Sequence, residues 1–325
     1  MSLGNPERPV GGLAVRAPSG VDLRPLSRSD LADAVRLARE LHGLPALPDP
    51  EPMRPRLDAL LGSVDVAPFL AMDAGSAIGL GVAQFRRRLN FAGFEGWVSD
   101  LYVSPEQRGR GVGRALLDAL IAEWRLRGGL RLQAKAPDDG GAVEGLYRAA
   151  GLQEWMLDFQ MRPLVVPSVQ LPAGVALRPL VEGDAEAVTT LIGQFGEARK
   201  PSPERRDAVQ RTFIAHLAST AAGGGYSAVA ESDGSVAGVC VIEWQRPFWT
   251  HEVHAWLPDL IVDESHRGQG IGRALLADAL RHAEAVGAAQ VSLESGPQRQ
   301  AAHGLYRAMG FVQRERTWLL RREPS

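Results

Sequence analysis

The sequence lacks the features that mark several large classes of protein. It contains a single cysteine, Cys240, so no disulfide can form within the chain, and a reducing compartment is favoured. Its net charge is −2, whereas a protein that coats nucleic acid needs a basic surface to displace counterions from phosphates. No apolar run approaches the roughly 18 residues of a membrane span, and the N-terminus shows no apolar segment of signal-peptide type. These absences predict a cytoplasmic protein with neither a membrane nor a nucleic-acid partner.

Two common phosphate-binding motifs are also absent. The pattern GxxxxGK[ST], which marks P-loop nucleoside triphosphatases, does not occur, and neither does the GxGxxG of dinucleotide-binding folds. The composition is otherwise that of an ordinary globular protein, with 45% hydrophobic and 23% charged residues. A length of 325 residues predicts about two domains.

The chain contains one pattern twice. Residues 107–113 read QRGRGVG and residues 266–272 read HRGQGIG, 159 positions later. The same offset joins LYRAAGL at 146–152 to LYRAMGF at 305–311. Because order and spacing persist over nearly the whole chain, we interpret the sequence as a duplicated domain and not as a solenoid, whose repeats are roughly 20–50 residues long.

The boundary between the copies is marked by prolines. The segment RPLVVPSVQLP at 162–172 is typical of a short, semi-rigid linker. The predicted division is a flexible leader at 1–19, an N-terminal domain at 20–165, a linker at 166–173 and a C-terminal domain at 174–325.

Each half has the same predicted order of elements. A first strand and two helices precede a hairpin, for which DAGS at 73–76 and SDGS at 232–235 are turn signals. A longer strand follows at 94–103 or 253–262, then the glycine-rich turn with its helix, a further strand, the helix that carries LYRA, and a final hairpin. This order predicts an α/β (α+β) fold of two tandem domains, each a mixed, mostly antiparallel sheet flanked by helices.

The glycine-rich turn predicts an anion site. It follows a strand and leads into a helix, so several backbone N–H groups and the positive end of the helix dipole point at one spot. Glycines leave room for a phosphate to approach the backbone, and arginines nearby can neutralise its charge. The residues predicted to form the two sites are Arg108, Gly109, Arg110, Gly111, Val112, Gly113 and Arg114, and Arg267, Gly268, Gln269, Gly270, Ile271, Gly272 and Arg273.

The chain resembles the GNAT N-acetyltransferase superfamily. Each half shows R-x-x-G-x-G after a D-L-x-V strand, followed some 30 residues later by L-Y-R-A-x-G. The resemblance implies that the turns bind the pyrophosphate of acetyl-CoA, used as co-substrate without a metal. It also implies an acetyltransferase enzyme that moves the acetyl group directly to an amine of a small molecule or to a terminal amine, as a monomer or homodimer.

The resemblance also implies the groups that act on the thiolate and the oxyanion. Family members often carry a tyrosine four residues before a glycine, which acts as the general acid for the departing thiolate. In this sequence the matching residues are Tyr147 and Tyr306. Backbone N–H groups would stabilise the oxyanion where the central strand separates from its neighbour, at Leu101 and Val103 in one half and at Leu260 and Val262 in the other. The asparagine that commonly precedes this tyrosine by seven residues is replaced by Gly140 and Arg299.

The general base is expected on the central strand. A frequent position in the family falls on Glu95 and His254, and a second position holds Trp97 and Trp256, which cannot act as bases. Strand alternation places Glu95, Trp97, Ser99 and Leu101 on one face and Val98, Asp100 and Tyr102 on the other. We predict Glu95 and His254 as the bases, with Asp100 and Asp259 as alternatives.

Other interpretations stay open. The alternatives are an enzyme in which one half has lost catalysis, a CoA-binding module without turnover, and a tRNA-dependent aminoacyl transferase, which the near-neutral charge disfavours. The segment HEVH at 251–254 does not predict a metal site, because residues three apart on a strand point to opposite faces.

Overall fold

The computed structural model describes residues 17–89, 91–137, 141–194 and 203–322, so most of the predicted leader lies outside it. The elements of the N-terminal half are β1 (Val21–Pro25), α1 (Leu31–Leu41), α2 (Arg54–Gly62), β2 (Val66–Asp73), β3 (Ser76–Arg88), β4 (Phe91–Val103), α3 (Val112–Leu126), β5 (Arg131–Pro137), α4 (Ala142–Ala149) and β6 (Gln153–Met161). None of the helices in the described ranges is long and apolar enough to cross a bilayer.

The C-terminal half repeats this order, as the duplicated sequence predicted. Its elements are β7 (Val175–Pro179), α5 (Ala185–Gly193), α6 (Pro203–Ala221), β8 (Gly225–Ser232), β9 (Ser235–Gln245), β10 (Val253–Val262), α7 (Ile271–Ala285), β11 (Ala288–Ser295), α8 (Gln300–Ala308) and β12 (Val312–Arg321). The predicted linker at 166–173 forms neither helix nor strand.

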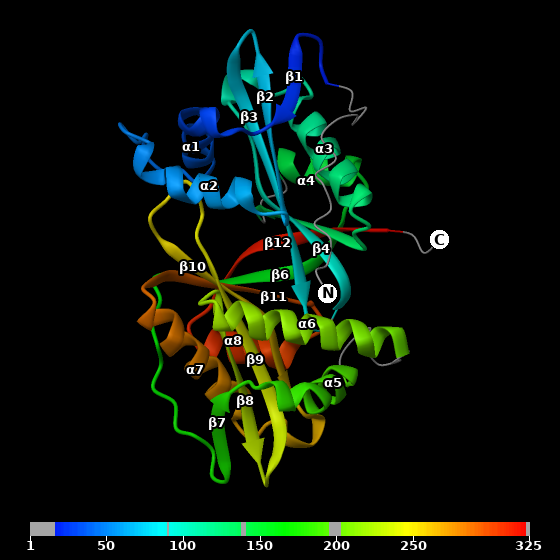
Figure 1. Ribbon diagram of the computed structural model, residues 1–325, viewed down its shortest axis with the longest axis vertical. Helices are drawn as coiled ribbons and strands as arrows, with labels where there is room; N and C mark the ends of the chain where they lie inside the picture. Colours follow the sequence, from blue (N-terminus) through cyan, green and yellow to red (C-terminus); the bar gives the residue numbers. More distant parts are fainter. Residues whose placement is uncertain (1–16, 90, 138–140, 195–202, 323–325) are drawn as a thin grey trace.

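All of these strands belong to one continuous sheet. Its hydrogen-bonded order is β1-β2-β3-β4-β5-β12-β6-β11-β10-β9-β8-β7. The two halves therefore lie end to end, with β6 and β12 at the centre of the molecule (Figure 1). In the N-terminal half, α1 and α2 lie on one side of the sheet and α3 and α4 on the other (Figure 1).

The two halves exchange their last strands. β12 pairs with β5 of the N-terminal half, from Glu315↔Pro137 to Arg321↔Arg131, whereas β6 pairs with β11 of the C-terminal half. The predicted final hairpin is therefore wrong, because each half ends in a single strand that completes the sheet of the other half. Alternating apolar residues predict that a strand forms, but they do not specify which edge it joins.

The central strand of each half contains an irregularity that reverses its faces. In β4, Val98 opposes Ala83 and Asp100 opposes Val82, so Ser99 is an extra residue of the kind that forms a β-bulge. Leu101 consequently packs with Val98 against the core beneath α3. The predicted sharing of one face by Leu101 and Trp97 is therefore wrong. β10 shifts register in the same way between Trp256 and Asp259.

Each half also inserts an apolar loop into the other. Leu89, between β3 and β4, is fully buried in the core formed by α5 and α6. Phe248 and Trp249, between β9 and β10, are buried in the core formed by α1 and α2, where the Trp249 ring stacks on His42 at 3.8 Å. These contacts add to the strand exchange in holding the halves together.

Candidate active site

Each glycine-rich turn leads into a helix, as the sequence predicted. Gly111 and Gly270 adopt φ of +87° and +88° and cap the N-termini of α3 and α7. Gly109 and Gly268 also have positive φ, a region that L side chains rarely adopt. A Cβ atom at Gly109 or Gly268 would meet nothing within 4 Å, so the turn lies open to a ligand.

The arginines of the turns are arranged differently in the two halves. Arg108 and Arg267 donate from Nε to the carbonyls of Val103 and Val262, at 3.0 and 3.3 Å, and so hold the end of the preceding strand. In the N-terminal half, Arg110 pairs with Asp73 at 2.7 Å and Arg114 pairs with Asp118 at 2.9 Å.

The corresponding positions of the C-terminal half carry less paired charge. Gln269 stands in place of Arg110, and an alanine stands in place of Asp118. Arg273 is exposed at the start of α7, where a guanidinium can neutralise a bound phosphate.

The central strands separate from their parallel neighbours where the sequence predicted. The last β4–β5 pair is Val98↔Ala134, and the last β10–β11 pair is Trp256↔Ser292, although all four strands continue further. The backbone groups predicted to hold an oxyanion, at Leu101, Val103, Leu260 and Val262, lie on the strands beyond these points.

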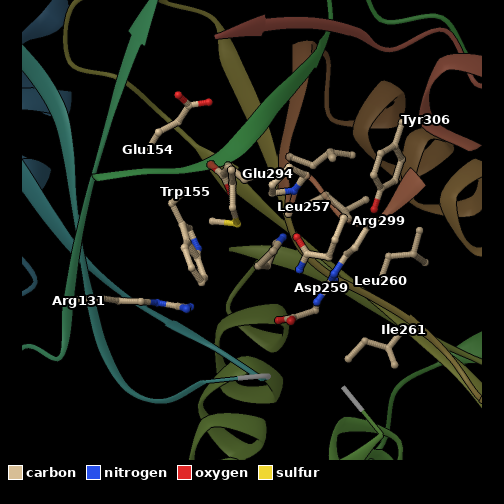
Figure 2. Close-up of a pocket in the computed structure, with 16 residues that line it drawn as sticks. Arg131, Glu154, Trp155, Leu257, Asp259, Leu260, Ile261, Glu294, Arg299 and Tyr306 are labelled. Carbon is tan, nitrogen blue, oxygen red and sulfur yellow. The ribbon is translucent and has the colours of Figure 1, made fainter. Parts of the chain in front are cut away.

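A cavity of about 470 Å³ opens at the separation of β10 and β11 in the C-terminal half. Figure 2 shows its lining, which includes the predicted residues Leu260 and Tyr306 and the alternative base Asp259. Four residues of the N-terminal half complete the wall: Arg131, Glu154, Trp155 and Met156. The strand exchange explains the presence of Glu154, Trp155 and Met156. β6 pairs with β11 only between Leu157 and Met161, and the β6 residues before Leu157 lie beside the gap.

The two predicted tyrosines differ in their surroundings. Tyr306 lines the cavity, its hydroxyl points toward the side chains that line it (Figure 2), and burial raises its pKa to about 12. Tyr147 is 3% exposed, and its hydroxyl donates to the carbonyl of Lys135 at 3.1 Å. Burial raises the pKa of Tyr147 as well, but its proton is already engaged by the main chain.

The two predicted bases lie outside the cavity lining. The fully buried carboxylate of Glu95 pairs with Nε of Arg131 at 2.7 Å, accepts from Gln133 at 2.9 Å, and lies 3.5 Å from Nη2 of Arg86. His254 contacts Glu252 at 3.1 Å and Gln290 at 3.2 Å, and burial lowers its pKa. Their catalytic roles stay predictions.

A further candidate base, Glu294, was not identified from the sequence. This β11 residue lines the cavity, accepts from Nε1 of Trp256 at 3.0 Å, and lies 3.3 Å from Nζ of Lys135. Although burial opposes the charged form of Lys135, Asp158 and Glu294 raise the pKa of its ammonium. In the sequence, only the polar end of the segment VSLES could have indicated Glu294. Its role as a candidate depends on its charged surroundings, which include the exchanged strand that carries Asp158.

The structure holds no evidence of a metal site among its described residues. No group of three or more histidine, cysteine or acidic side chains comes close enough to hold an ion in the described ranges. Of the two histidines in HEVH, His251 is exposed and His254 is buried. Gly140, one of the two positions where the asparagine of the resemblance is replaced, lies outside the described residues.

Comparison with known proteins gives two kinds of match. The model of the acetyltransferase (GNAT) family matches residues 34–152 and 189–311. A mycothiol acetyltransferase of Streptomyces avermitilis is 31% identical over 229 residues, covering 69% of this chain and 71% of the relative. A mycothiol acetyltransferase of Thermomonospora curvata is 33% identical over 224 residues, covering 66% and 69%.

Solved structures share the two-domain arrangement. A tandem GNAT protein from the clavulanic acid biosynthesis pathway superposes with a TM-score of 0.60 at 18% identity, covering 94% of this chain and 99% of that chain. A GCN5-related N-acetyltransferase from Sphaerobacter thermophilus superposes with a TM-score of 0.62 at 19% identity, covering 95% and 98%. At these identities the likeness concerns the fold alone.

Proposed function

Because this chain belongs to the acetyltransferase (GNAT) family, whose members use acetyl-CoA, we propose that its C-terminal half transfers the acetyl group directly to the amine of a small molecule in the cavity beside Tyr306. The observation that carries the proposal is the contrast between the tyrosines. The Tyr306 hydroxyl faces a cavity, whereas the Tyr147 hydroxyl is bonded to a main-chain carbonyl. Relatives named mycothiol acetyltransferase support a small-molecule acceptor.

In this proposal the turn at 268–272 holds the pyrophosphate at the positive end of α7. Gly270 contributes an exposed backbone N–H, and Arg273 adds a positive charge at the same helix end. The thioester carbonyl then lies in the gap between β10 and β11, where the backbone N–H of Leu260 stabilises the oxyanion. Pro258 has no N–H to offer, which favours Leu260 for this role.

The acid–base steps use side chains of the same cavity. The acceptor loses its ammonium proton to a carboxylate, and the neutral nitrogen attacks the thioester carbon. The carbon–sulfur bond then breaks, the departing thiolate takes the proton of Tyr306, and the proton that the amide nitrogen must still lose restores the tyrosine hydroxyl. A pKa raised to about 12 keeps that hydroxyl protonated at neutral pH. Asp259 and Glu294 are the cavity carboxylates that the C-terminal half contributes, and we propose one of them as the base in place of His254.

A second candidate function assigns acetyl-CoA binding without transfer to the N-terminal half. Its glycine-rich turn has the same geometry as the other. Trp249 of the C-terminal half is buried on the side of the N-terminal sheet where α1 and α2 lie. The hydroxyl of Tyr147 is engaged by the carbonyl of Lys135.

Calorimetric titration of acetyl-CoA into the wild-type chain and into the matched variants Gly111→Glu and Gly270→Glu tests both ideas. A glutamate at either position opposes the phosphate by bulk and charge. We expect two binding sites in the wild type, one site in each variant, and thiol release from acetyl-CoA with an amine panel that only Gly270→Glu abolishes. Loss of thiol release in Gly111→Glu alone, at unchanged melting temperature, contradicts the assignment to the C-terminal half, and a wild-type chain that binds no acetyl-CoA contradicts the function itself.

A further inference from the structure

The wall of the cavity opposite Tyr306 comes from the N-terminal half. Arg131 begins β5, and Trp155 and Met156 lie on the exchanged strand β6 (Figure 2). The groups of the proposed reaction lie on β10, β11 and α8. An acceptor whose amine reaches the thioester therefore has the rest of its body against β5 and β6.

The side chain of Arg131 is held in a fixed position. Its Nε pairs at 2.7 Å with Glu95, which is fully buried, and the side chain of Arg131 is 10% exposed. Gln133 donates to the same carboxylate oxygen, and Arg86 approaches the other. A guanidinium has five N–H donors in a planar fork that matches a carboxylate, and the side chain that carries this fork lines the cavity.

Charged side chains of both signs line the cavity. Asp259 and Glu294 lie on the side of the proposed reaction, where they attract an ammonium group. On the opposite wall, the side chain of Arg131 lines the cavity, held by the buried carboxylate of Glu95. Of the other charged lining residues, Glu154 is paired with Arg316 at 2.8 Å, and Arg299 lies on the side of Tyr306 (Figure 2).

The same wall offers an apolar surface. The indole of Trp155 lines the cavity, and the guanidinium of Arg321 lies 4.2 Å from its centroid. Met156 lies beside it along β6 and also lines the cavity. A flat ring with a flexible thioether beside it suits an aromatic or aliphatic body.

We propose that the acceptor is a primary amine that also carries a carboxylate, with an apolar body lying on Trp155 and Met156 and the carboxylate bound by Arg131. A carboxylate fits better than a phosphate, because a dianion would be repelled by the three acidic side chains that also line the cavity. This inference rests on the proposed function, since it takes the same cavity as the acceptor site.

Matched ligand pairs test it by calorimetry on the full chain loaded with CoA. The pairs are 4-(aminomethyl)benzoate with benzylamine, and phenylalanine with phenylalaninamide. We expect at least one acid to bind tenfold or more tightly than its partner without a carboxylate, and Arg131→Gln to bring that ratio close to one. Arg125→Gln removes the same charge from an exposed position on α3 and is expected to leave the ratio unchanged.

Equal binding of the acid and its carboxylate-free partner in both pairs, or a preference that persists in Arg131→Gln, overturns the proposal. The double variant Glu95→Gln/Arg131→Gln controls for the carboxylate left behind, and it should show the same loss of preference. Failure of the proposed function looks different: the acids still bind through Arg131, but none of the amines is acetylated. Acetylation of only those amines that lack a carboxylate keeps the function and refutes the carboxylate.

Discussion

Removing the hydroxyl of Tyr306 is expected to lower activity, whereas removing the hydroxyl of Tyr147 is expected to lower stability. Tyr306→Phe removes the proposed acid from a cavity, where the hydroxyl faces the lining side chains. General acid catalysis contributes about 10²–10⁴-fold to rate, so kcat should fall by that factor. Because the ring contacts with Phe159 and Phe311 are kept, the free energy of unfolding should change by less than about 0.5 kcal/mol.

Tyr147→Phe removes a hydrogen bond and leaves chemistry untouched. The lost bond runs from the buried hydroxyl to the carbonyl of Lys135 at 3.1 Å. A net loss of about 1–2 kcal/mol is expected, because the bond disappears and the carbonyl loses a partner in a dry environment. For a chain of 325 residues that corresponds to a fall of roughly 1–3 °C in melting temperature, with kcat changed less than about threefold.

The two variants are compared by thiol release from acetyl-CoA at saturating acceptor and by thermal unfolding of the same preparations. The reasoning is refuted if Tyr147→Phe lowers kcat a hundredfold while Tyr306→Phe leaves it intact. Equal effects of the two variants on kcat would mean that both halves transfer acetyl groups.

Two further predictions concern stability. A hydrogen bond from Arg24 lowers the pKa of Asp30 to about 2. The ionised pair therefore stabilises the fold above the unfolded-state pKa near 4, and this stabilisation is lost as pH falls toward 2. Asp30→Asn should flatten the acid side of the stability profile measured by urea unfolding. Gly225→Ala places a Cβ 2.4 Å from a main-chain oxygen of β9 and should destabilise the fold by more than about 2 kcal/mol. Gly304→Ala on α8 meets nothing within 4 Å and should stabilise the fold by up to about 1 kcal/mol. A destabilising Gly304→Ala, or an Asp30→Asn profile identical to that of the wild type, contradicts these assignments.

The parts of the fold that depend on local chemistry could be predicted from the sequence. The positive φ of Gly111 and Gly270, the start of α3 at Val112, and the turns at DAGS and SDGS all follow from residues that are neighbours in the chain. The exchange of β6 and β12 could not be predicted, because their alternating pattern fits the edge of either half. The composition of the acceptor wall depends on that exchange, so Arg131 and Trp155 were missed together with it.

The duplicated glycine motif has a structural role that is independent of any ligand. Gly111 turns the chain in the left-handed region, so that α3 can begin at Val112 and bury Leu116, Leu117 and Trp124 against the sheet. A substitution there costs folding as well as phosphate binding, so selection for stability alone would keep the turn in a half that no longer transfers acetyl groups. The N-terminal half also cannot be dispensed with, because the C-terminal sheet is completed by β6 and the cavity by Arg131. In the proposed function one reaction site is built from both halves, and the hydrogen bond of Tyr147 argues against catalysis in the N-terminal half more strongly than the intact glycine motif argues for it.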